Sequence, residues 1–163
     1  MEDSITDYLV QISRLNLTQE QSIENVHLLN ITKDLEHIGD LIERNLLDLL
    51  RKKADADAVF SAEGNQELHD YHRRVVDNFD TAIHAFDQGD AALAQTVLKT
   101  KSDLVDLEWA YRKTHYGRLS SALPESLESS QIHLELVDSL RRVDSHVESI
   151  ARSVLEEAGR QGN

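Results

Sequence analysis

A chain of 163 residues with 40% hydrophobic residues is long enough to form one domain with a sizeable core. It has no cysteine, which excludes disulfides and thiolate metal sites, and its single proline and six glycines favour long helices. The formal net charge of −13 would repel nucleic acid, so we expect no nucleic-acid partner. No apolar run approaches the length of a membrane span.

The first part of the chain has the apolar spacing of two helices. A short helix is predicted over residues 4–15. Thr18 and Gln21 then have the spacing of a capping box, which begins a long helix predicted over residues 19–54. A loop over residues 55–61 follows.

The rest of the chain predicts three more helices. Gly89 suits the left-handed position at the end of the third helix, and Asp90 suits the N-cap of the fourth. A break over residues 121–124 ends the fourth helix, and Pro124 suits the first position of the fifth. We expect the tail, residues 159–163, to be frayed.

Short connections between long helices predict antiparallel neighbours. We therefore expect an all-α fold, an antiparallel up-down four-helix bundle of long helices with a short extra N-terminal helix. No domain boundary interrupts residues 1–163, which predicts a single domain. Residues 35–42 and 140–147 share an apolar pattern, which indicates that the second and fifth helices are related repeats.

Two carboxylates on the long helix are candidate metal ligands. Glu36 and Asp40 are four residues apart and share a face at the border of the apolar stripe. With oxygen ligands from a neighbouring helix they could bind a hard cation or iron, and the alternative is a solvated acidic face. Gly39 costs the helix about 1 kcal/mol relative to alanine, which close approach of another helix or a ligand would explain.

The sequence offers little support for catalysis. Glu24 and His27 have the Glu-x-x-His spacing of di-iron bundles, but those proteins need a second such pair. His69 and His72 share a face without a glutamate to complete that pattern. The sequence has no phosphate loop and no nucleophile elbow. We therefore expect no catalytic residue, and a metal-dependent bundle enzyme is the weaker alternative.

Basic side chains are concentrated in segments that an up-down bundle brings to one end. This predicted basic pole consists of Arg51, Lys52, Lys53, Arg73, Arg112, Lys113 and Arg118. Matching of the helix dipole explains cations at helix C-termini but not those near the start of the third helix. We expect the basic pole to contact an acidic partner, a phosphate-bearing ligand or an anionic membrane surface.

Residues 35–40, with the sequence Leu-Glu-His-Ile-Gly-Asp, resemble the Leu-Glu-Arg-Ile-Gly-Asp signature of the PhoU family. The resemblance implies two three-helix repeats, each with an acidic motif that binds a metal cluster, and a role in phosphate uptake. It also implies that residues 1–57 form the end of a first repeat and residues 61–159 a complete second repeat.

The second repeat departs from the family motif. Arg141 and Ser145 stand where the motif has an acidic pair, so we expect the second metal cluster to be absent. Because most of the first repeat is missing, we expect no cofactor and at most weak divalent or iron binding at Glu36 and Asp40. Residues 111–115 and 140–147 resemble the tail of bacterial sodium/phosphate cotransporter-type proteins.

This resemblance implies a non-catalytic regulatory domain of a sodium/phosphate cotransporter-type membrane protein, on the cytoplasmic side of the inner membrane. We expect the chain to be a fragment of that protein. Its expected partners are the membrane transport domain of the same polypeptide or a transporter subunit, and a second copy in a homodimer. The alternative is a free-standing PhoU-type regulator that binds a transporter or a sensor kinase, which would need two competent acidic motifs.

Overall fold

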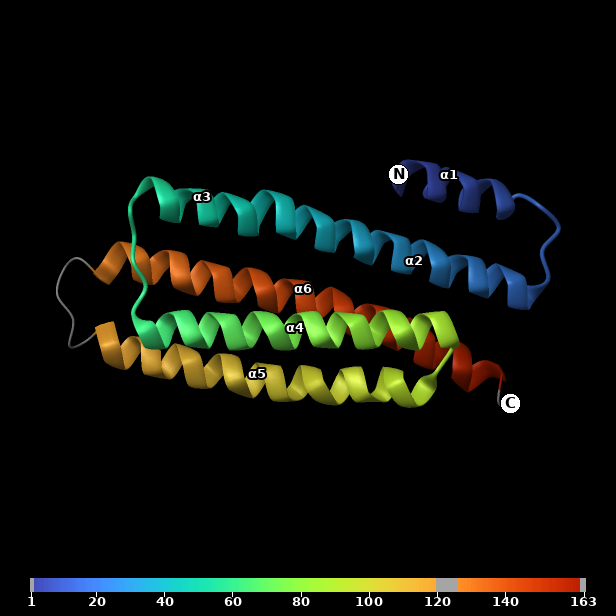
Figure 1. The fold of residues 1–163 in the computed structure, drawn as a ribbon. Coiled ribbons are helices and arrows are strands. Elements are labelled where there is room, and N and C mark those ends of the chain that lie inside the picture. Colours follow the sequence, from blue (N-terminus) through green and yellow to red (C-terminus); the bar gives the residue numbers. More distant parts are fainter. Residues whose placement is uncertain (1, 120–125, 162–163) are drawn as a thin grey trace.

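The computed structural model describes residues 2–119 and 126–161, and this part of the chain contains helices and short connections but no strand (Figure 1). The helices are α1 (Glu2–Ile12), α2 (Gln19–Leu41), the π-helical turn η1 (Ile42–Leu46), α3 (Leu47–Asp55), α4 (Ala62–Gln88), α5 (Ala91–Leu119) and α6 (Ser126–Gln161). The segments α2, η1 and α3 form one continuous rod, which corresponds to the long helix predicted from the sequence.

The ends of these helices follow local sequence signals. Thr18 and Gln21 form both hydrogen bonds of the predicted capping box. Gly89 has a φ of 61°, the left-handed conformation that glycine adopts without strain, and it ends α4 as predicted. The carboxylate of Asp90 accepts the backbone N–H groups of Ala92 and Leu93, at 2.7 and 3.1 Å, and so caps α5.

The sequence also predicted a break before the last helix and a frayed tail after it. The break at residues 121–124, including Pro124, lies outside the described residues. The expectation of a frayed tail is wrong up to Gln161, because α6 continues to that residue.

The fold is an all-α bundle in which successive long helices reverse direction, as predicted (Figure 1). Helices α4, α5 and α6 pack against one another as a three-helix bundle. The α2–η1–α3 rod packs on α6, and α1 folds back onto α2. Among the described residues, no Cα atom of α2 lies within 8 Å of one in α4 or α5. The rod is therefore attached to the three-helix bundle mainly through α6.

Small residues allow the helices of the core to approach closely. Four alanines are fully buried: Ala82 and Ala85 on α4, Ala94 on α5 and Ala151 on α6. Larger buried side chains, such as Leu104 and Ile150, fill the space between them. Burial of each of these larger side chains stabilises the fold by about 1.5–3 kcal/mol.

The π-helical turn keeps the apolar face of the rod directed at α6. Leu41 and Leu49 are buried and Leu46 is half-buried. From Leu41 to Leu46 the spacing is five residues, which an α-helix cannot place on one face but a π-turn can. The backbone N–H of Leu47 bonds to the carbonyl of Ile42, which is the i→i+5 bond that produces this shift.

The outer face of the rod carries several exposed apolar residues. The apolar spacing of the long helix places Leu35 and Ile42 on its expected buried face, but both are exposed, as are Leu47 and Leu50. The buried positions of α2 are instead Asn25, His27, Ile31, Asp34, Ile38 and Leu41. This correction follows from the position of α6, which covers only one side of the rod.

Candidate functional site

Glu36 and Asp40 lie on the open side of α2. Glu36 is exposed, and Asp40 is half-buried with a carboxylate oxygen 3.0 Å from Nη1 of Arg44. Among the described residues, neither belongs to a group of three side chains close enough to hold one metal ion. A Cβ added to Gly39 would meet no atom within 4 Å, so no described helix approaches it. That these two carboxylates bind metal at most weakly stays a prediction.

Arg141 and Ser145 lie on α6 within the three-helix bundle, where Arg141 is half-buried and Ser145 is exposed. A guanidinium nitrogen of Arg141 is 2.9 Å from Asp138, and another is 3.6 Å from the buried carboxylate of Glu108. The hydrogen bond to Asp138 raises the pKa of Arg141 above its ordinary value, and partial burial opposes this only in part. Arg141 therefore supplies a fixed positive charge between two carboxylates.

A buried ion pair in the three-helix bundle was not predicted from the sequence. Asp144 on α6 is fully buried, with one oxygen 3.1 Å from Nζ of Lys101 and the other accepting a hydrogen bond from Asn78 at 2.8 Å. Lys101 also donates to the hydroxyl of Ser145 at 3.1 Å. The available signal was the position of Asp144 between Leu140 and Val147, which places it on the apolar face of α6.

The segments of the basic pole do lie at one end of the bundle, where α3 ends, α4 begins and α5 ends (Figure 1). Several of its cations are engaged by nearby carboxylates: Arg51 by Asp48, Arg73 by Asp70 and Arg112 by Glu108. Lys53 lies over the ring of Phe60, 4.9 Å from its centre, whereas Lys52 and Lys113 are exposed. The side chain of Arg118 lies outside the described part. Contact of this pole with a partner stays a prediction.

A groove at this end runs between the rod and α6. Its volume is about 440 Å³. It is lined by four basic residues, three acidic ones and four others: Arg44, Lys52, Arg112, Arg142, Asp48, Glu135, Asp138, Asn45, Leu49, Leu134 and Ser139. The near balance of charge gives no strong preference for an anion such as phosphate.

Asp70 and Tyr111 link α4 to α5 near the basic pole. The hydroxyl of Tyr111 donates to the carboxylate of Asp70 at 3.0 Å. Partial burial tends to raise the pKa of Asp70, but the Tyr111 hydrogen bond and the charges of Arg74 and Arg73 outweigh it and lower the pKa. Burial and the Asp70 contact raise the pKa of Tyr111 to about 12.

The residues considered for a di-iron centre do not form one within the described chain. His27 is buried, but its carboxylate neighbours are Glu156 and Glu157 of α6, at 3.7 and 3.9 Å. Glu24 is exposed on α2. His69 and His72 are exposed on α4.

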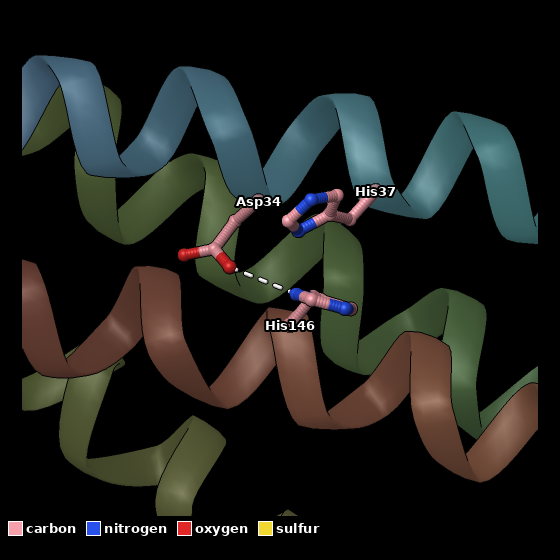
Figure 2. Close-up of side chains that lie close together, drawn as sticks. All are labelled: Asp34, His37 and His146. Carbon is pink, nitrogen blue, oxygen red and sulfur yellow. Dashed lines mark hydrogen bonds and ion pairs between the residues drawn. The ribbon is translucent and has the colours of Figure 1, made fainter.

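One group of potential metal ligands does converge, at the contact between α2 and α6 (Figure 2). Asp34 and His37 come from α2, and His146 comes from α6. Nδ1 of His146 lies 2.8 Å from Oδ1 of Asp34, and the two imidazole rings are 5.0 Å apart. This group was not predicted from the sequence. The signal in the sequence was the i, i+3 spacing of Asp34 and His37, but the contribution of His146 depends on how two distant helices pack.

Comparison with known proteins identifies the family. The PhoU domain family matches residues 68–154, which is more than half of the chain. The chain belongs to the PhoU family. No solved structure matches this PhoU chain closely enough to be significant.

Several bacterial relatives match this PhoU chain along most of its length. The Escherichia coli K12 protein named "Putative inorganic phosphate export protein YjbB" is 29% identical over 150 residues. The Salmonella typhimurium protein of the same name is 30% identical over 150 residues. Each match covers 92% of this chain and 28% of the relative, so the chain spans just over a quarter of the length of these relatives.

The matched PhoU residues fall within α4, α5 and α6. They include Arg141 and Ser145 but not Glu36 or Asp40. In the described part of this chain, no helix is both long and apolar enough to cross a membrane.

Proposed function

We propose that this PhoU chain is a non-catalytic regulatory domain that controls the transport of inorganic phosphate from the cytoplasmic side of a membrane. The observation that carries the proposal is the family membership, together with full-length relatives named for phosphate export.

The finer form of the proposal is a domain of a sodium/phosphate cotransporter-type membrane protein. The relatives are more than three times as long as the matched region, which leaves room in them for a transport portion. The exposed apolar residues on the outer face of the rod, Leu35, Ile42, Leu47 and Leu50, would provide the contact with it. The alternative, a free-standing regulator that binds a separate transporter or sensor kinase, is supported equally by the family match.

Phosphate flux in cells that carry the native gene tests the proposal. Uptake and efflux of radiolabelled phosphate are compared between the intact gene and a gene lacking the region for residues 1–163. We expect deletion to change the flux, and Leu35→Asp with Ile42→Asp to have the same effect. Trp109→Asp is the matched control, because Trp109 is exposed on α5, and no described Cα atom of α5 lies within 8 Å of one in the rod. Unchanged flux after deletion would contradict the regulatory role.

The two forms of the proposal differ in what the chain binds. In the free-standing form, the purified chain retains a membrane transporter or a sensor kinase from solubilised membranes when added in trans. In the cotransporter form, the contact is within one polypeptide, so a membrane-spanning region is encoded in the same reading frame. Sequencing of the native locus decides between them.

A further inference from the structure

Asp34, His37 and His146 form a compact group of metal-ligating side chains that the proposed function does not use (Figure 2). Each residue offers one ligand atom, and these three atoms lie within 4.8 Å of one another. Two of the ligands belong to α2 and one to α6, so the group joins the rod to the three-helix bundle. A single ion placed between them would contact both helices.

The chemistry of this group favours a transition-metal cation. Imidazole nitrogen suits Zn²⁺, Fe²⁺, Ni²⁺ and Cu²⁺, whereas Mg²⁺ and Ca²⁺ prefer sites built from oxygen. Two histidines and one carboxylate, with the remaining positions left to water, form a donor set found in zinc and non-haem iron sites. His37 is exposed, so an ion can reach the group from solvent.

The competing explanation is a hydrogen-bonded aspartate–histidine pair without a metal. The contact between His146 and Asp34 would satisfy that explanation alone. It does not account for His37, which follows Asp34 by three residues and therefore lies on the same face of α2. The ring of His37 is tilted by 53° over that of His146, so a third ligand is held beside a buried carboxylate.

We propose that Asp34, His37 and His146 bind one Zn²⁺-like divalent cation that ties α2 to α6. Because the rod contacts the three-helix bundle mainly through α6, the ion would strengthen the attachment on which the position of the whole rod depends. The site differs from the predicted pair Glu36 and Asp40. The proposal does not rest on the role in phosphate transport.

Titration of the chelator-treated protein with ZnCl₂ in a calorimeter tests the site. We expect one Zn²⁺ per chain, and no competition from Mg²⁺ at the same concentration. His37→Ala is the decisive variant, because His37 is exposed and its removal should leave the fold intact. We expect it to weaken Zn²⁺ binding at least about tenfold, with Asp34→Asn and His146→Ala doing the same. The matched control is His84→Ala, an exposed histidine on α4.

Two further readouts separate this site from general surface binding. In NMR spectra, Zn²⁺ should shift the imidazole signals of His37 and His146 rather than those of the other histidines. Zn²⁺ should also raise the melting temperature of the unmodified protein more than that of the His37→Ala variant. Absence of one-to-one binding, or affinity unchanged in either histidine variant, would overturn the proposal, as would an equal loss in His84→Ala.

Discussion

The ammonium group of Lys101 lies 3.1 Å from a carboxylate oxygen of Asp144, which is buried completely among three helices. The second oxygen of Asp144 accepts a hydrogen bond from Asn78. Each helix of the three-helix bundle thus contributes one member, with Asn78 on α4, Lys101 on α5 and Asp144 on α6. Because an unpaired buried charge is costly, this network favours one alignment of the helices over others.

Lys101→Met should destabilise the protein strongly. It leaves the charge of Asp144 buried without its partner, and breaking a buried pair in this way costs about 3–5 kcal/mol. The free energy of unfolding from urea titration measures the effect. Lys99→Met is the control, because Lys99 is an exposed residue two positions before Lys101 on α5. Its loss should lower the free energy of unfolding by less than about 0.5 kcal/mol.

A second variant shows whether charge or packing causes that loss. Lys101→Met combined with Asp144→Asn removes both charges and should recover much of the stability. If the double variant were no more stable than Lys101→Met alone, the ion pair would not be the cause.

Arg141→Glu should also destabilise the protein, through repulsion. Arg141 lies 2.9 Å from Asp138 and 3.6 Å from Glu108, so the substitution brings a third carboxylate to two existing ones. We expect unfolding to become easier by more than about 2 kcal/mol, because charged hydrogen bonds are also lost. Arg142→Glu, at an exposed neighbouring position, is the control.

Divalent cations should reverse part of this effect. A cluster of carboxylates suits Mg²⁺ or Mn²⁺, so either ion should raise the melting temperature of the Arg141→Glu variant more than that of the unmodified protein. If the ions raised the melting temperature of both proteins equally, the positive charge of Arg141 would not be acting in place of a bound cation.

The helices and their ends could be predicted from the sequence because they depend on local signals. The capping box at Thr18 and the left-handed Gly89 are examples. The buried face of α2 could not be predicted as well. Leu35 and Ile42 fit an apolar stripe, yet they are exposed, since the helix that covers this rod contacts only its other side.

The candidate sites also divide into those set by spacing along one helix, which the sequence predicts, and those set by packing between helices, which it does not. Glu36 and Asp40 were found because a four-residue spacing on one helix is visible in the sequence. The group of Asp34, His37 and His146 was missed, since His146 lies more than a hundred positions from the other two and meets them only through packing of α2 on α6. The one-residue shift at the π-turn is likewise a product of packing.

Tyr111→Phe should have an effect that depends on pH. The lowered pKa of Asp70 means that its ionised form stabilises the fold above its ordinary pKa of 3.8, and this contribution is lost as the pH falls through the lowered value. The raised pKa of Tyr111 means that its contribution is present below pH 10 and is lost as the pH rises towards about 12. The loss of unfolding free energy caused by Tyr111→Phe should therefore be greatest at pH values between the pKa of Asp70 and that of Tyr111.

Because the contact is partly exposed, we expect a cost of only about 1 kcal/mol near neutral pH. Urea unfolding at pH 7 and at about pH 3 measures the difference between variant and unmodified protein. Tyr116→Phe, at an exposed site on α5, should show no such difference. A cost that is equal at both pH values would mean that the bond to ionised Asp70 does not contribute.

Gly39→Ala should stabilise the isolated chain. Gly39 lies inside α2, and an added Cβ would meet no atom within 4 Å, so the substitution removes backbone freedom from the unfolded chain without a clash. We expect a gain of about 0.5–1 kcal/mol in urea unfolding, and the same gain for Gly117→Ala inside α5, where a Cβ also has open space.

In the native gene the two substitutions should differ in their effect on phosphate flux. If the outer face of the rod contacts a transport domain, Gly39→Ala alone should alter phosphate flux, because its methyl group lies between the exposed side chains of Leu35 and Ile42. Equal and unchanged flux in both variants would show that no partner approaches the rod at Gly39.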